Sequence, residues 1–201
     1  MPSRLPLALL ALAYWLSTAH ANARLVGGEV APPLPAWTEF CGRLPTECAV
    51  DHTEPEIIIL TPETRELIEA VNHYVNRSLT AMLDEKHWGK IDQWDLPSDG
   101  YGDCEDYQLL KRKLLVEAGL PRRALRMTIV IDEMEKGHAL LTVRTPGEDL
   151  ILDNRTGAVL GWDQTGYTFV KRESANRVGW EFLDRAASDV VAQQASISPV
   201  P

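Results

Sequence analysis

The stretch GDCEDYQLLKRKLLVEAGLP at residues 102–121 predicts the helix around which the fold is built. Gly102 lets the chain turn sharply, and the helix is expected to begin at Cys104. Gly119 followed by Pro121 is a typical helix stop. A cysteine at a helix N-terminus faces the positive end of the helix dipole, which favours the thiolate, and the unpaired first-turn N–H groups can bind an oxyanion. The predicted apolar stripe of this helix is Tyr107, Leu110, Leu114, Leu115 and Ala118.

Apolar periodicity predicts one helix before this stretch and four strands after it. Thr61 can cap the earlier helix, Pro62 suits its first position, and the helical spacing continues to about Lys86. Residues 87–102 hold glycines, a proline and three large aromatics, so we expect a loop that packs on the core or lines a substrate groove. The predicted strands are residues 125–132, 139–144, 151–153 and 167–171. Helices followed by an antiparallel meander indicate one α+β domain.

Two polar residues on these strands are expected to lie close together. His138 begins one strand and Asp153 ends the next, with a turn expected at residues 145–148. Counting outward from the turn brings His138 within two positions of facing Asp153, inside the diagonal-neighbour distance of about 7–8 Å. An imidazole held by a carboxylate opposite Cys104 is a nucleophilic Cys-His-Asp arrangement. The spacing alone leaves open a buried thiol and a structural His and Asp, and His87 is the alternative base.

The N-terminus has the pattern of a secretory signal peptide at residues 1–23. It holds one basic residue, an apolar run and small-x-small cleavage sequences. An uncleaved membrane anchor is the alternative, although the run is short for a permanent span. We therefore expect a periplasmic or secreted protein without stable membrane insertion. The predicted organisation continues with a flexible leader at residues 24–36, one folded domain at residues 37–185 and a frayed tail at residues 186–201.

Export implies an oxidising compartment for the three cysteines. Cys41 and Cys48 lie close together in FCGRLPTEC and are the expected disulfide pair, which leaves Cys104 as the free thiol. Two unpaired buried thiols are the alternative. The formal net charge is −9, and no basic patch offsets it. Such an acidic chain repels nucleic acid, so nucleic-acid binding is excluded as a function.

Carboxylates crowd around the candidate nucleophile. Asp103, Glu105 and Asp106 adjoin Cys104, and like charges so close raise the pKa of a thiol. A hard divalent cation bound by carboxylate oxygens would relieve this repulsion, and Asp99 is a candidate for a further ligand. The alternative is a set of ordinary helix N-terminal acids that complement the dipole without a metal. Zinc is disfavoured because Cys104 has no second Cys or close His at ligand spacing.

Three motifs carry a resemblance to a known family. They are GDCEDY at 102–107, GHALLTV at 137–143 and LDN at 152–154. Over residues 36–183 the chain resembles the bacterial transglutaminase-like cysteine proteinases. The resemblance implies a papain-like or transglutaminase-like fold, with N-terminal helices packed on an antiparallel sheet, for the domain at residues 37–185. It also implies Cys104 as nucleophile, His138 as general base and acid, and Asp153 as the residue that orients the imidazole.

LapG-type members of this family are periplasmic proteases that clip large surface adhesins and so release biofilm. The resemblance therefore implies a protein substrate and calcium bound through Asp103 and Glu105. It also implies restraint by an inner-membrane receptor for cyclic di-GMP. Hydrolysis and acyl transfer are not separated by the motifs. A transglutaminase-like acyltransferase or an amidase uses the same triad, and a non-catalytic binding module can keep the same fold.

Overall fold

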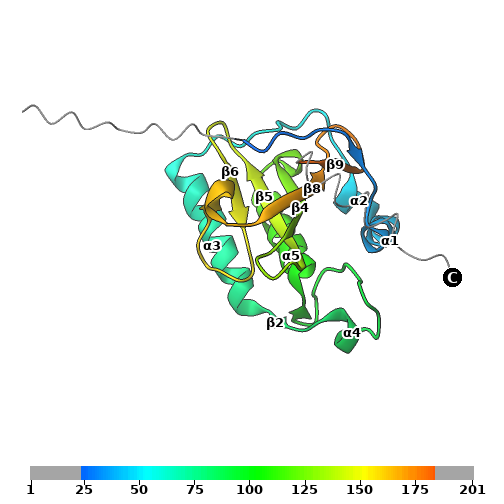
Figure 1. Cartoon of the computed structure of the whole chain (residues 1–201). Coiled ribbons are helices and arrows are strands. Elements are labelled where there is room, and N and C mark those ends of the chain that lie inside the picture. The colour runs from blue at the N-terminus through cyan, green and yellow to red at the C-terminus, as the bar shows by residue number, and fades with distance from the viewer. Residues whose placement is uncertain (1–23, 184–201) are drawn as a thin grey trace, which may run out of the picture.

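The computed structural model describes residues 24–183, so the expected signal peptide and C-terminal tail lie outside the described residues. A seven-stranded antiparallel sheet, in the order β1-β9-β8-β4-β5-β6-β7, is packed against helices α3 and α5 (Figure 1). Its strands are β1 Val30–Ala31, β4 Leu125–Ile131, β5 Gly137–Arg144, β6 Asp149–Leu152, β7 Leu160–Gly161, β8 Thr168–Glu173 and β9 Trp180–Phe182. The helices are α1 Pro35–Arg43, α2 Pro45–Cys48, α3 Pro62–Ser78, α4 Asp84–His87 and α5 Cys104–Glu117. The predicted α+β class is confirmed.

The four predicted strands are confirmed as β4, β5, β6 and β8. Arg144 pairs with Asp149 across the β5–β6 hairpin, which is the predicted register. The pairing of Leu141 with Leu152 then brings the residue after β6 beside the first half of β5. The three strands of the seven-stranded sheet that the sequence did not reveal, β1, β7 and β9, have only two or three residues each. Such short strands carry too few alternations to show a period of two.

Helix α5 begins at Cys104 as predicted, but its buried face is only partly the predicted apolar stripe, of which Tyr107 and Leu115 are buried. Leu110 and Leu114 are only half-buried, and Ala118 is exposed. Gln108 and Lys111 are fully buried instead. The helix packs against α3 and against strand β5, so polar side chains also face the interior. The period of hydrophobic residues therefore predicted the helix but only part of its buried face.

Helix α3 ends at Ser78, eight residues before the predicted end at Lys86. Its start is as predicted, because the Thr61 hydroxyl accepts a hydrogen bond from the backbone N–H of Thr64 at 3.2 Å. Beyond Ser78 the chain is extended, and the short strands β2 (Thr80–Ala81) and β3 (Tyr101–Gly102) pair in parallel. This pairing ends the helical pattern and brings α4 next to the turn that carries Cys104.

Residues 24–36 are not a free leader, which corrects the sequence-based expectation. The backbone N–H of Leu25 donates to Asp149 Oδ2 at 3.1 Å, and the Leu25 carbonyl accepts from Arg172 Nη2 at 3.3 Å. Strand β1 pairs with β9, and Ala31 is buried. Backbone groups satisfied by buried charged side chains hold this segment on the sheet. Composition alone did not reveal these long-range partners.

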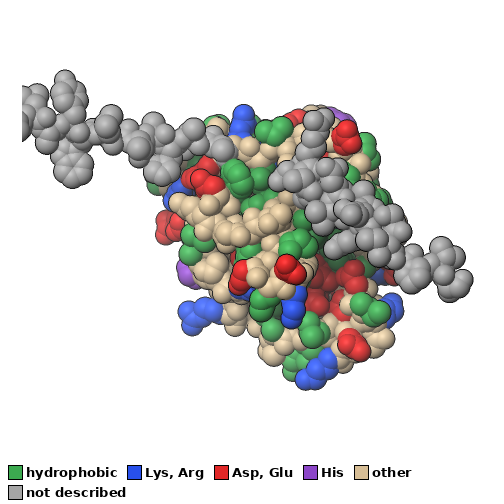
Figure 2. Space-filling view, viewed as in Figure 1, with side chains coloured by type: hydrophobic (Ala, Val, Ile, Leu, Met, Phe, Trp, Pro, Cys, Tyr) green, Lys and Arg blue, Asp and Glu red, His purple; other side chains and the backbone are tan. Residues whose placement is uncertain are grey.

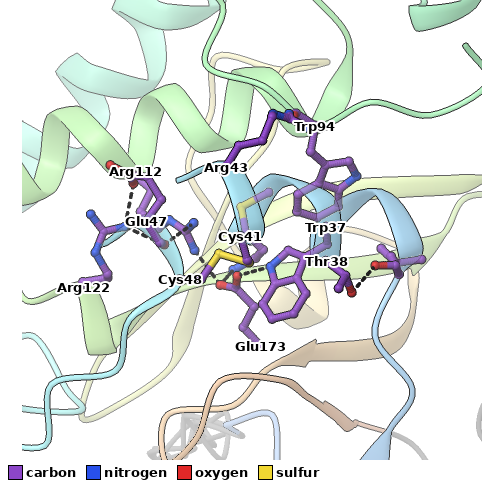
Figure 3. The surroundings of a disulfide bond; sticks show 12 residues. Trp37, Thr38, Cys41, Arg43, Glu47, Cys48, Trp94, Arg112, Arg122 and Glu173 are labelled. Atoms are coloured by element: carbon purple, nitrogen blue, oxygen red, sulfur yellow. Dashed lines mark hydrogen bonds and ion pairs between the residues drawn. A yellow bond between two sulfur atoms is a disulfide. The ribbon is translucent and has the colours of Figure 1, made fainter. Parts of the chain in front are cut away.

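The predicted disulfide between Cys41 and Cys48 is present and joins α1 to α2 (Figure 3). Beside it, Arg112 and Arg122 both donate to the backbone carbonyl of Glu47 at 3.0 Å. Arg112 Nη1 also lies 2.6 Å from Glu173 Oε2. The disulfide-linked segment is thereby fixed to the middle of α5. Within residues 24–183, no helix has the length and apolar character needed to cross a membrane.

Candidate active site

Cys104 is the first residue of α5 and the only free cysteine within the described part of the chain. Its thiol donates to Glu105 Oε2 at 3.2 Å. The backbone N–H of Ala139, the residue after His138, hydrogen-bonds the sulfur. This contact brings the N-terminus of α5 beside the first half of strand β5. The thiol therefore lies next to the strand that carries the candidate base.

Burial raises the pKa of the Cys104 thiol well above its ordinary value, and the carboxylate of Glu105 raises it further. The Ala139 N–H opposes this shift, and the carboxylate of Asp103 adds to it. We expected the helix dipole to favour the thiolate, but without a cation the desolvation and the acidic neighbours outweigh it. A positive charge near these carboxylates would shift the balance back towards the thiolate.

His138 and Asp153 form the predicted imidazole–carboxylate pair. His138 Nε2 lies 2.8 Å from Asp153 Oδ1, and both residues are 3% exposed. The Tyr167 hydroxyl donates to Asp153 Oδ2 at 2.8 Å, and the backbone N–H of Arg155 donates to Oδ1 at 3.0 Å. Burial alone raises the pKa of Asp153, but the hydrogen bonds from His138, Arg155 and Tyr167 hold it below its ordinary value. Because Nε2 faces Asp153, Nδ1 is the ring nitrogen left for the thiol.

Sequence reasoning did not identify Tyr167 as a partner of Asp153. Tyr167 precedes β8 and its ring also packs edge-on against His138, with centroids 5.8 Å apart. Asn76 of α3 donates to the Asp153 backbone carbonyl at 2.8 Å and to that of Thr156 at 2.8 Å. Asp153 is thus held through its side chain and its backbone. Neither partner lies near Asp153 in sequence, so no local signal announced them.

Five carboxylates gather around the N-terminus of α5, which we call the acidic pocket: Asp84, Asp92, Asp103, Glu105 and Asp106. In two groupings, Asp84–Asp92–Glu105 and Asp84–Asp103–Asp106, oxygens lie within 4.8 Å of one another. A third grouping joins Asp103 and Glu105 to the Cys104 sulfur. Figure 2 shows acidic side chains gathered in a hollow of the surface. The acidic residues next to Cys104, which are Asp103, Glu105 and Asp106, are evident from the sequence, whereas Asp84 and Asp92 are not.

The acidic pocket fits a hard cation. Within residues 24–183, none of its carboxylates forms an ion pair with Lys or Arg, and Asp84 Oδ1 and Asp103 Oδ1 are buried without a hydrogen-bond partner. Burial raises the pKa of Asp106 to about 8, with Asp103 and Asp84 adding to the shift. Burial likewise raises the pKa of Asp84 to about 6, and that of Glu105 well above its ordinary value. Uncompensated buried carboxylate oxygens are the donor set that calcium prefers.

Asp99 and His87, which the sequence suggested as a further calcium ligand and as an alternative base, contact each other. Asp99 Oδ2 is 2.8 Å from His87 Nε2, and Asp99 Oδ1 accepts from the Tyr101 backbone N–H at 3.1 Å. Asp99 belongs to none of the metal-compatible groups in the described residues. The ring of His87 stacks on Trp88, with centroids 4.1 Å apart. The candidate further ligand and the candidate alternative base are therefore paired with each other.

A model of a protein family described as bacterial transglutaminase-like cysteine proteinase matches residues 26–187. The chain belongs to this family. Membership in the bacterial transglutaminase-like cysteine proteinases makes the protein a cysteine peptidase, as the motifs predicted. The helices and antiparallel sheet are those of the transglutaminase-like α+β fold.

Solved structures that are similar to this chain support its assignment to the family. Legionella pneumophila LapG matches with a TM-score of 0.52 and 26% identity, covering 67% of this chain and 76% of LapG. An EGTA-treated form matches with a TM-score of 0.52 and 28% identity over 62% of this chain and 69% of its own. A calcium-bound form matches with a TM-score of 0.50 and 26% identity over 68% and 82%. No curated protein matched the chain.

Proposed function

We propose that the protein hydrolyses peptide bonds with Cys104 as nucleophile, His138 as general base and acid, and Asp153 as the residue that orients the imidazole. The observation that carries the proposal is the buried 2.8 Å contact between His138 Nε2 and Asp153 Oδ1. It leaves Nδ1 of His138 available to the thiol. His138 lies on β5, and the backbone N–H of the following residue, Ala139, hydrogen-bonds the Cys104 sulfur. Nucleophile, base and orienting carboxylate are the three roles that thiol hydrolysis needs.

In the first half of the reaction, the Cys104 proton passes to His138 and the sulfur attacks the peptide carbonyl carbon. The C–N bond breaks as His138 returns the proton to the leaving amine, which gives a thioester. Water then attacks the thioester and gives a proton to His138, and the proton finally returns to the released sulfur. The backbone N–H of Cys104 in the first turn of α5 is our candidate for an oxyanion donor.

We infer that calcium binds in the acidic pocket through Asp103 and Glu105, with Asp84 and Asp92 as further ligands. The unpaired oxygens of Asp84 and Asp103 support this assignment. A calcium-bound form of LapG from Legionella pneumophila supports it by analogy. Bound calcium would supply positive charge that offsets the carboxylates next to Cys104. Asp103 and Glu105, which flank Cys104, would then fix the start of α5 and hold the thiol beside the strand that carries His138.

The cellular role is proposed from the family. We propose that residues 1–23 direct export and that the mature protein acts in the periplasm or outside the cell. The proposed substrate is a large surface adhesin, whose cleavage would release biofilm. An inner-membrane receptor for cyclic di-GMP is the proposed regulator. Comparing new N-termini of cell-surface proteins between cells with wild-type protein and with Cys104→Ala tests this role, and an unchanged set would contradict it.

The triad itself is tested with two histidine variants that differ in their predicted role. His138→Ala is expected to abolish cleavage of a peptide library, and Cys104→Ala to do the same while the circular dichroism spectrum stays native. His87→Ala is the matched control, because His87 is paired with Asp99 and not with Asp153. Normal turnover by His138→Ala, or equal losses in both histidine variants, would remove the proposed triad.

Acyl transfer is the rival reaction for the same three residues. Incubating the protein with a glutamine-containing peptide and a primary amine, and analysing the products by mass spectrometry, separates the two reactions. Hydrolysis gives shorter peptides, whereas acyl transfer gives an amine adduct and ammonia. A chain that gives neither product and whose Cys104 is not labelled by a thiol-reactive probe would be a non-catalytic binding module.

A further inference from the structure

Lys111 is the most unusual buried charge in the described part of the chain. Its side chain is 0% exposed, its Nζ has no hydrogen-bond partner among residues 24–183, and no carboxylate lies within ion-pair distance. Lysine is almost never fully buried unless it is paired. An unpaired buried ammonium destabilises a fold, so packing alone gives no reason for a lysine here.

Lys111 lies on the same face of α5 as the nucleophile. Cys104, Gln108 and Lys111 follow the i, i+4, i+7 spacing, which places them along one helix face. Gln108 is also 0% exposed, and neither atom of its amide has a partner in the described residues. A polar stripe therefore runs from the candidate active site into the interior of the molecule.

The charged group that acts on Lys111 is Asp153. Burial lowers the pKa of Lys111 to about 7, and the carboxylate of Asp153 opposes this shift, so the ammonium is the main form below about pH 7. Helix α3 packs against α5 and also holds the Asp153 loop through Asn76. The ammonium and the orienting carboxylate are thus brought into one buried region by α5, α3 and the loop after β6.

The neighbouring Arg112 shows what a structural buried cation looks like in this protein. Its guanidinium is 2.6 Å from Glu173 Oε2 and also donates to the Glu47 carbonyl. Lys111, one residue away, has no such partners. The field of Asp153 is the interaction that remains for it, which distinguishes Lys111 from the cations that hold the fold together.

We propose that Lys111 is a positioning residue whose ammonium offsets part of the Asp153 field felt by His138. This inference rests on the proposed roles of His138 and Asp153. A carboxylate orients the imidazole but also stabilises the imidazolium, which makes it a weaker acid. A cation near that carboxylate limits the stabilisation. His138 then stays acidic enough to protonate the leaving amine.

Other titratable groups also face this region. They are Cys104 on α5, His73 on α3 against Gly157, Arg155 and Tyr167 on the loops around Asp153, and Asp132 at the end of β4, which pairs with Arg155. These groups are unchanged when Lys111 alone is replaced. A difference between the wild-type and Lys111 variants therefore reports the ammonium, provided that the fold is intact.

The test measures the imidazolium pKa of His138 by NMR in a Cys104→Ala background, with and without Lys111→Met. Removal of the cation is expected to raise the pKa of His138 by at least about half a unit. In the protein with Cys104 intact, Lys111→Met is expected to lower kcat about 10-fold with little change in KM. Lys111→Arg should restore part of both values. Lys113→Met is the matched control, because Lys113 is on the same helix but pairs with exposed Glu117.

Stability separates this role from a structural one. Lys111→Met is expected to melt at the same temperature as the wild-type protein or higher, because an unpaired buried charge is removed. An unchanged His138 pKa in Lys111→Met would overturn the proposal, whatever happens to turnover. If Lys111→Met does not fold, Lys111→Gln is measured in the same way. The NMR titration needs no turnover, so it decides the role of Lys111 even if the proposed protease activity fails.

Discussion

The two ends of helix α5 carry buried charge in opposite ways. At the N-terminus, the carboxylates of the acidic pocket surround Cys104 without a Lys or Arg partner in residues 24–183. In the second half, the buried guanidinium of Arg112 is paired with Glu173, and just beyond the C-terminal end of the helix Arg122 is paired with Glu47. Both regions are rich in charge, but only one is balanced by the chain's own residues.

This difference separates charges that hold the fold from charges that need something else. A buried pair with good geometry is satisfied, and removing one partner leaves the other uncompensated. A buried cluster of one sign raises the pKa values of its members and favours a ligand of opposite sign. The balanced end is therefore expected to respond to mutation through stability. The unbalanced end is expected to respond through metal dependence and activity.

The largest expected effect is the loss of activity when calcium is removed from the acidic pocket. An excess of a calcium chelator is expected to reduce turnover to background, and added calcium should restore it. At calcium 100-fold above its Kd, the free energy of unfolding should rise by about 2.7 kcal/mol. Turnover and urea denaturation with and without calcium measure both effects.

Two aspartate variants sharpen this prediction. Asp84→Asn removes a buried member of the acidic pocket and should raise the calcium concentration needed for half-maximal activity at least about 10-fold. Asp99→Asn is the matched control, because Asp99 pairs with His87 outside the pocket. Full turnover of the wild-type protein in excess chelator, or an equal effect of both variants, would remove the metal assignment.

The two ends of α5 also differ in how well the sequence predicted them. The positions of Cys104 at a helix start and of His138 beside Asp153 on a short hairpin could be predicted, because local register fixes them. Asp84 was missed because it lies 19 positions before Asp103 in sequence, in a segment that looked like a continuation of α3. Only the parallel pairing of β2 with β3 reveals that this segment turns back towards Cys104.

The buried face of α5 was only partly predicted from the sequence, for a related reason. Hydrophobic periodicity assigns leucines to the interior, and Leu115 is indeed buried, but Gln108, Lys111 and Arg112 are buried as well. Partners such as Glu173 and Asp153 lie more than 40 positions away in sequence. Long-range partners decide whether a polar side chain can be buried, and one sequence does not show them.

The second largest effect is expected at the balanced end of α5. Glu173→Gln leaves the Arg112 guanidinium buried without its counter-charge and disturbs acceptors for Trp37 Nε1 and the Met127 N–H. We expect a loss of about 3–5 kcal/mol in the free energy of unfolding. Turnover per folded molecule should stay near the wild-type value. Urea denaturation and active-site titration with a thiol probe measure the two quantities.

An exposed ion pair on the same helix provides the control for Glu173→Gln. Glu117→Gln breaks the pair between Lys113 and Glu117, which are four residues apart and substantially exposed. Its expected cost is only about 0.3–0.5 kcal/mol. A loss for Glu173→Gln as small as that for Glu117→Gln would contradict the structural role assigned to the Arg112–Glu173 pair.

A smaller loss of stability is expected when the disulfide beside this balanced end is removed. The double variant Cys41→Ala/Cys48→Ala frees a closed loop with a sequence separation of 7. The chain-entropy estimate for such a loop is about 2.5 kcal/mol. Calcium dependence should be unchanged, because neither cysteine belongs to the acidic pocket. A shifted calcium requirement in this variant would show that the two ends of α5 are coupled.

The smallest expected effect is a pH dependence of stability in metal-free protein. Burial raises the pKa of Asp106 to about 8 and that of Asp84 to about 6, whereas both are near 3.8 when unfolded. Between about pH 4 and pH 7 these two carboxylates therefore make the folded protein hold more protons than the unfolded one, so its stability falls as pH rises. The lowered pKa values of Asp132 and Asp153 act below about pH 4, whereas the lowered pKa of Lys111, about 7, opposes the trend only above about pH 7.

Melting temperatures of metal-stripped protein from pH 5 to pH 7 test this sign. They should decline by a few degrees, and the decline should be weaker in Asp84→Asn, which has one titrating carboxylate fewer. Saturating calcium should remove the decline, because it binds the ionised carboxylates of the acidic pocket and so stabilises the folded state most at high pH. A rise in melting temperature with pH in the metal-free protein would mean that these carboxylates are already compensated, and the contrast between the two ends of α5 would then disappear.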